Sequence, residues 1–156
     1  MSDTNEQPLS EEEYFKSVGL VKNEWDGRQV DWLLQWLCAF INDTNLRVGI
    51  TLTVGGSIIT GTLIPHQDYF ERLAADFSSP FAKTSEENRA AIHERILSFH
   101  VPLDPSAVPT PVQYIHVDNA RVHTGGSQVF PDKGTLWRGK ISAVEGFVLG
   151  ELNTSK

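Results

Sequence analysis

Residues 47–70, RVGITLTVGGSIITGTLIPHQDYF, contain the pattern that decides the fold of this chain. Two runs of apolar and β-branched residues flank Gly55-Gly56, a two-residue connection typical of a tight β-hairpin. Gly61 lies inside the second run, where a glycine often marks a sharp bend or a bulge. Pro65 ends this run, and we expect Tyr69-Phe70 to resume strand pairing. The stretch therefore predicts a long hairpin whose second strand is bent.

A helix is predicted before the hairpin, over about residues 27–42, because two apolar stripes follow the helical period there. The aliphatic stripe is Val30, Leu33, Leu34, Leu37 and Ile41, and the aromatic stripe is Trp32, Trp36 and Phe40. The aliphatic stripe is enough to cover one face of a small sheet. The aromatic stripe therefore needs a second surface against which to pack. Aromatic side chains are enriched in protein interfaces. We therefore expect the aromatic stripe to form an oligomer interface, with the chain's own insertion helix as the alternative cover.

An insertion interrupts the strand pattern over about residues 76–111. A capping-box pattern precedes apolar residues that repeat at helical spacing to about His100, and a proline-rich loop follows. A further strand is expected from Tyr114, and a last strand or strand pair within residues 136–152. Gly146 lies inside this last run and predicts a second bend.

Composition indicates a single globular domain. The chain has 156 residues, of which 40% are hydrophobic, and a net charge of −7. This charge disfavours an extended nucleic-acid-binding face. The lone Cys38 cannot form an internal disulfide, and no leader-like or membrane-length apolar run is present, so a cytoplasmic protein is expected. We predict a flexible N-terminal tail over residues 1–22 and one domain over residues 23–156.

The order of these elements resembles that of the Sm-like proteins. In that family the first motif places a glycine, a leucine and an aspartate, and Gly61, Leu63 and Asp68 stand in these roles, with Asp68 one residue late. Arg72 stands where the family usually has an RNA-contacting asparagine, and Arg138-Gly139 matches the second motif. The resemblance implies a mainly β fold: a strongly bent five-stranded barrel with an N-terminal helix and a helical insertion between strands 3 and 4. An all-β sandwich and an α+β roll are the alternatives.

The same resemblance gives a candidate lumen or RNA-type site, made of Asp68, Arg72, Arg138 and Gly139. Arg138 would reach the lumen of a ring, where an arginine can stack on a base or bind a phosphate. The alternative role for Arg138 is a structural ion pair with Asp68 or Asp118. A ring that binds short single-stranded RNA is the second functional hypothesis, and the acidic balance of the chain makes RNA the less favoured partner.

A second resemblance covers most of the chain from Asp31. The segments DWLLQWL, VGITLTVGGSIITGTLI with YFERLAADF, and YIHVDNARV followed by LWRGKISAVEGFVLGEL are similar to the gas vesicle accessory protein GvpU family. This resemblance implies a non-enzymatic protein associated with gas vesicles and with their clustering. It makes an assembly or accessory function, exerted through protein contacts, the favoured hypothesis. Gas vesicle surface proteins are then candidate partners.

Catalytic and cofactor motifs are not found in the sequence. The P-loop, the GxGxxG fingerprint and the GxSxG elbow do not occur, and Cys38 lies in an apolar helix where a thiol stays protonated. His93 with His100, and His116 with Asp118, share faces of a helix and a strand, but neither pair specifies a third metal ligand. We therefore predict no enzyme, no cofactor and no metal; an enzyme or metal-dependent protein is the third hypothesis.

Assembly into a ring is predicted from the strand edges. Residues 58–64 and 146–150 carry no charge, and an uncharged exposed edge invites pairing with another strand. Head-to-tail pairing between copies closes into a cyclic homo-oligomer, for which the Sm-like resemblance suggests about five to seven subunits. Membrane association is not expected.

Overall fold

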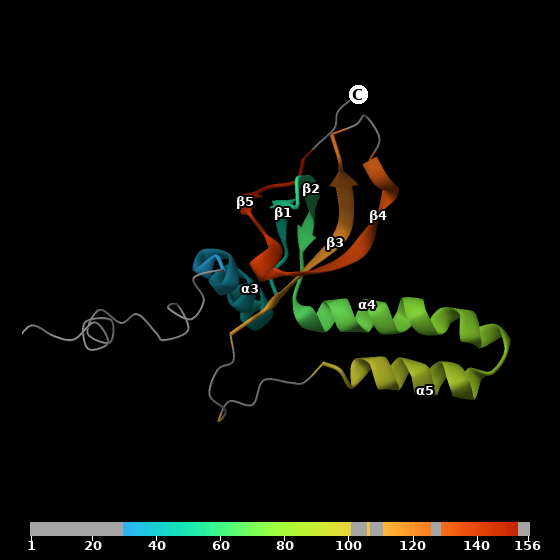
Figure 1. Ribbon diagram of the computed structural model, residues 1–156. Helices are drawn as coiled ribbons and strands as arrows, with labels where there is room; N and C mark the ends of the chain where they lie inside the picture. Colours follow the sequence, from blue (N-terminus) through green and yellow to red (C-terminus); the bar gives the residue numbers. More distant parts are fainter. Residues whose placement is uncertain (1–29, 101–105, 107–110, 126–128, 153–156) are drawn as a thin grey trace, which may run out of the picture.

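A computed structural model describes residues 30–100, 106, 111–125 and 129–152 of the chain (Figure 1). The helices are α3 (Trp32–Thr44), α4 (His66–Ser78) and α5 (Glu86–Leu97), with two 3-10 turns, η1 (Ser79–Lys83) and η2 (Ile141–Ala143). The strands are β1 (Val48–Val54), β2 (Ser57–Leu63), β3 (Tyr114–His123), β4 (Val129–Lys140) and β5 (Gly146–Leu149). They form one antiparallel sheet in the order β4-β3-β2-β1-β5.

The β1–β2 hairpin confirms the prediction from the glycine pair. Val54 pairs with Ser57 across the turn. Gly55 and Gly56 both have positive φ, 56° and 76°, the left-handed backbone that a two-residue hairpin turn of this hand requires. The alternating pattern of β1 then places Ile50 and Leu52 in the core.

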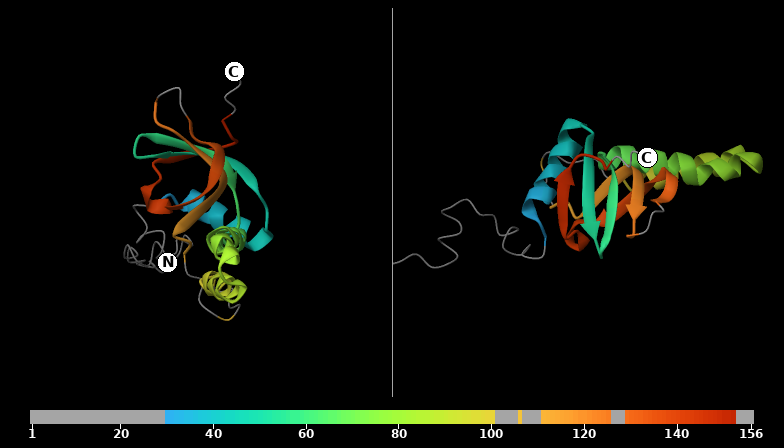
Figure 2. Two further views of the ribbon diagram at one scale, coloured as in Figure 1. Left: turned by 90° about the vertical axis from the view of Figure 1, so that its right-hand side faces the viewer. Right: turned by 90° about the horizontal axis from the view of Figure 1, so that it is seen from above.

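The sheet bends at Gly61, as the sequence predicts. The pairing of β2 with β3 shifts register between Thr60 and Thr62. A Cβ added at Gly61 would lie 2.6 Å from the carbonyl oxygen of Asp118 and 2.8 Å from Val117 Cγ1. The backbones of β2 and β3 therefore approach too closely here for any residue with a side chain. Figure 2 shows the sheet curling around the core with α3 beneath it. No pairing joins β4 to β5 within the described residues, so five antiparallel strands are confirmed but a closed barrel is not.

The aliphatic side of α3 fills the interior of the curved sheet. Asp31 caps the helix by accepting hydrogen bonds from the backbone N–H groups of Leu33 and Leu34, and Asn45 ends it with a φ of 56°. The hydrophobic core is built from side chains of the helix, the hairpin, β3 and η2. These are Leu34, Cys38 and Ile41 of α3; Ile50, Leu52, Ile59 and Leu63 of the hairpin; Ile115, Val117 and Ala120 of β3; and Ile141 of η2. The predicted helix is confirmed, although it extends to Thr44 and its predicted first residues lie outside the described part.

The prediction that Tyr69-Phe70 would resume strand pairing is wrong. Both residues lie in α4, which begins directly after Pro65, the residue at its N-cap. A proline fixes φ near the helical value, so it starts a helix here as readily as it ends a strand. The helical insertion therefore begins at His66, not near residue 76, and separates β2 from β3 instead of a third strand from a fourth.

Helix and strand contents are similar in the described residues. The helices hold 13, 13 and 12 residues, and the strands hold 7, 7, 10, 12 and 4. The helix content is higher than the sequence predicts because α4 includes Tyr69-Phe70, where strand pairing was expected. No described helix has the length and apolar character needed to cross a membrane. The predicted tail over residues 1–22 lies outside the described residues.

Candidate functional site

Asp68 and Arg72 of the predicted site attach α4 to the sheet. Arg47, just before β1, donates from Nε and Nη2 to Asp68 Oδ2 at 2.9 and 2.5 Å. Arg72 forms an ion pair with Asp118 of β3. Asp68 also lies in the first turn of α4, where a carboxylate is favoured by the helix dipole. Each of the two predicted residues is therefore committed to an ion pair within the chain.

Arg138 and Gly139 lie on β4 opposite β3. Arg138 Nε donates to His116 Nε2 at 3.3 Å, and its guanidinium carbon is 3.6 Å from the ring centroid of Tyr114, a cation–π contact. Asp68 and Asp118 pair with Arg47 and Arg72 instead of Arg138, so the ion pair given as the alternative role of Arg138 is not formed with either carboxylate. Gly139 has a packing role, because a Cβ there would lie 2.1 Å from the indole of Trp137.

His116 is the most perturbed group in this region. Its side chain is buried, and burial, followed by the charge of Arg138 and by His66, lowers its pKa to about 3. The ring is therefore neutral at physiological pH, and Nε2 is the unprotonated nitrogen that accepts the hydrogen bond from Arg138.

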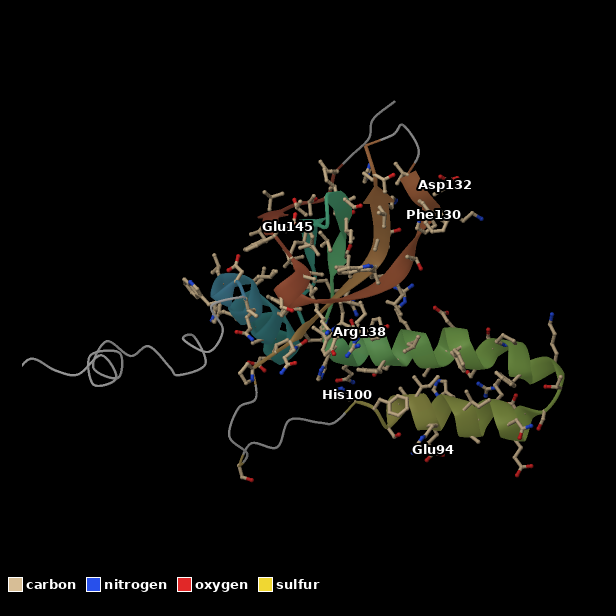
Figure 3. The ribbon with its side chains drawn as sticks, in the orientation of Figure 1. Glu94, His100, Phe130, Asp132, Arg138 and Glu145 are labelled. Carbon is tan, nitrogen blue, oxygen red and sulfur yellow. The ribbon has the colours of Figure 1, made fainter. Side chains whose placement is uncertain are left out.

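Aromatic rings connect His116 to two further histidines. Tyr69 of α4 packs against His116 at 4.5 Å between ring centroids, and Phe70 lies 6.3 Å from His116 and 6.5 Å from His100. His66 and His100 meet edge to face at 4.3 Å. We call His66, Tyr69, Phe70, His100 and His116 the histidine cluster. Figure 3 shows its surroundings, with Arg138 at the lower end of the sheet and His100 at the end of α5.

The sequence did not reveal the histidine cluster. It placed His116 on one face of a strand, but the rings that cover His116 are those of Tyr69 and Phe70, which were predicted to resume strand pairing and lie in α4 instead. Pro65, directly before α4, was the signal in the sequence that could have indicated a helix start there. His93 and His100 were considered together as possible ligands on one helix face, but α5 ends at Leu97, and His100 lies beyond it against His66. No group of three or more His, Cys, Asp or Glu side chains suited to a metal ion occurs among the described residues.

Cys38 behaves as a core side chain. Burial raises the pKa of its thiol to about 12, so the reactive thiolate is not formed at physiological pH.

The aromatic stripe of α3 is exposed to solvent in the described chain. Trp32 is 61% exposed, Trp36 55% and Phe40 39%, and the rings of Trp36 and Phe40 stack at 5.3 Å. The helical insertion, the alternative cover, extends away from the sheet on another side (Figures 1 and 2). Within the described residues this surface is therefore unoccupied, and its role as an oligomer interface stays a prediction.

The two outer strands have opposite character. The short strand β5 presents exposed Val148 and Leu149 and carries no charge. The longer strand β4 presents exposed Phe130 and carries Asp132 and three basic residues: Lys133, Arg138 and Lys140.

Comparison with known families shows which family the chain belongs to. The family model described as gas vesicle protein GvpU-like matches residues 31–152. The chain belongs to the GvpU-like family. The match begins at the N-cap of α3 and ends just after β5, so the aromatic stripe, the histidine cluster and both outer strands of this GvpU-like chain lie inside the family's region. No curated protein and no solved structure matches the chain.

Proposed function

We propose that this GvpU-like chain is a non-enzymatic gas vesicle accessory protein that acts through protein contacts as a cyclic homo-oligomer. The family match supports the gas vesicle role. The single observation that supports action through contacts is the exposed aromatic stripe of α3, because a monomer gains nothing from leaving two tryptophans and a phenylalanine in water.

The strand order supports a ring of Sm-like subunits. β4 and β5 are the two outer strands, so β4 of one copy can pair with β5 of the next, and this contact repeats head to tail. Glu145 and Glu151 flank β5, while β4 carries Lys133, Arg138 and Lys140. The opposite charges near the two edges favour contact between copies.

Sedimentation velocity tests the ring. We expect the full chain to sediment as one species of about five to seven subunits, the size suggested by the Sm-like resemblance, in a closed head-to-tail assembly. Val148→Lys adds a charge to the β5 edge and should shift the protein toward monomer, because a charged edge opposes pairing. Glu94→Lys on the exposed face of α5 is the matched control and should leave the assembly unchanged. A clean monomer at micromolar concentration would refute the ring.

Flotation tests the gas vesicle role separately. Purified chain is mixed with intact gas vesicles, and the buoyant fraction is assayed for bound protein. We expect the chain to float with intact vesicles and to stay in solution when the vesicles have been collapsed by pressure and removed. Val148→Lys in the same assay shows whether binding needs the oligomer. Failure of the wild-type chain to float with vesicles would contradict the proposed role whatever its oligomeric state.

A further inference from the structure

The helical insertion is joined to the sheet at one end only. α4, η1 and α5 form a hairpin that extends away from the strands (Figures 1 and 2). α5 packs on α4 and η1, while contacts to β3 and β4 come from α4. The last turn of α5 returns to the start of α4, where His100 meets His66. The position of the whole hairpin therefore depends on a small contact region.

The histidine cluster makes up this contact region together with the ion pairs of Asp68 and Arg72. His66 stands at the first position of α4, His100 just after α5, and His116 on β3, and the rings of Tyr69 and Phe70 fill the space between them. Three histidines from three segments thus meet at the base of the hairpin. A proton on His66 would place a charge inside this aromatic packing, which burial disfavours.

The charges around the cluster do not compensate for added protons. The facing groups are Asp68, Tyr69 and Arg72 on α4, Tyr114 and Asp118 on β3, Arg138 on β4, and Arg47 before β1. Asp68 and Asp118 are already paired with arginines. On α5, Arg95 lies over the ring of Phe99, and Figure 3 shows Glu94 on the outer side of the helix.

A further observation shows that the neutral ring of His66 is favoured. Burial, and then His100, lower the pKa of His66 below its ordinary value. The partner ring in this contact is tightly enclosed, since His100 Nδ1 is buried without a hydrogen-bond partner among the described residues. Protonation of His66 therefore acts against the packed arrangement of the His66–His100 contact.

We propose that the histidine cluster is an acid-sensitive clamp, which holds the end of α5 against the start of α4 at neutral pH and releases it when His66 is protonated. The released state binds more protons than the clamped state, so the balance moves toward release as the pH falls through the ordinary range of imidazole. Release changes the position of α5 and leaves the sheet and its α3 core folded, because the core cluster contains none of the three histidines.

Hydrogen exchange of the full chain, followed by mass spectrometry, tests the clamp at about pH 7.5 and about pH 5.5, on either side of the ordinary imidazole pKa. After correction for the intrinsic rate, we expect protection in the last turns of α5 and the first turn of α4 to fall once the pH drops below about 6.5, with a limiting slope of about tenfold per pH unit for uptake of one proton by His66. Protection of β1 and β2 should change much less.

The variant His66→Phe keeps an aromatic ring but cannot take up a proton, and should remove most of this pH dependence. His93→Phe on α5 lies outside the cluster and should leave the pH dependence intact. If His66→Phe does not fold, imidazole NMR titration of the wild-type chain replaces it, and the amides at the end of α5 should shift with the His66 titration. Equal protection at both pH values, or the same pH dependence in His66→Phe as in the wild-type chain, would overturn the proposal.

Discussion

Replacing Gly61 with alanine tests the close approach that bends the sheet. The added Cβ would lie 2.6 Å from Asp118 O, 2.8 Å from Val117 Cγ1 and 3.1 Å from Ala120 Cα. Two of these atoms belong to backbone that is held in the β2–β3 pairing, so β3 must shift. Overpacking of this kind costs about 1–3 kcal/mol. For a chain of this size, the melting temperature should fall by about 2–4 °C for each kcal/mol lost.

Gly146→Ala is the matched control for this substitution. Gly146 is also a strand glycine, the first residue of β5, but a Cβ there meets nothing within 4 Å, and its φ is not in the left-handed region. Alanine should therefore be neutral or stabilise the chain by up to about 1 kcal/mol, through the lower entropy of the unfolded state. Both variants are compared with wild type by thermal unfolding at one protein concentration, because assembly shifts the apparent stability. If Gly61→Ala melts at the same temperature as Gly146→Ala, the close approach does not determine the bend.

Three further predictions concern single side chains. The pKa of His116 is about 3 in the fold and about 6.5 when unfolded, so its contribution to stability is complete above about pH 6.5 and is lost as the pH falls. At about pH 5 this loss is about 2 kcal/mol, measurable by denaturant unfolding at two pH values, and the loss in His116→Phe should be smaller by about this amount. Arg72→Ala breaks the exposed ion pair with Asp118 and should lower the free energy of unfolding by less than about 1 kcal/mol; a larger loss in the same assay would show that the pair is essential to the attachment of α4. Cys38 should react with a thiol reagent only as the chain unfolds, and rapid reaction of the native chain would contradict its place in the core.

Part of the candidate site followed from local sequence and part did not. Arg138-Gly139 was found from its motif, and the structure places it beside β3, but the partners of Arg138 are His116 and Tyr114 rather than a carboxylate. A motif identifies a residue on a strand, whereas its partners depend on which side chains the neighbouring strand and α4 bring to the same place.

The sequence by itself determined the hairpin at Gly55-Gly56, the bend at Gly61 and the helix with two apolar stripes, because turn chemistry, the lack of a Cβ and side-chain periodicity act over a few residues. It did not determine the secondary structure of Tyr69-Phe70, because a short aromatic pair after a proline fits a strand or a helix equally well. Only the tertiary structure decided that α4 begins there and brings His66 against His100, since this contact joins segments that are distant in the chain. The histidine cluster depends on the packing of α4, the end of α5 and β3 against one another, and no local sequence pattern specifies that packing.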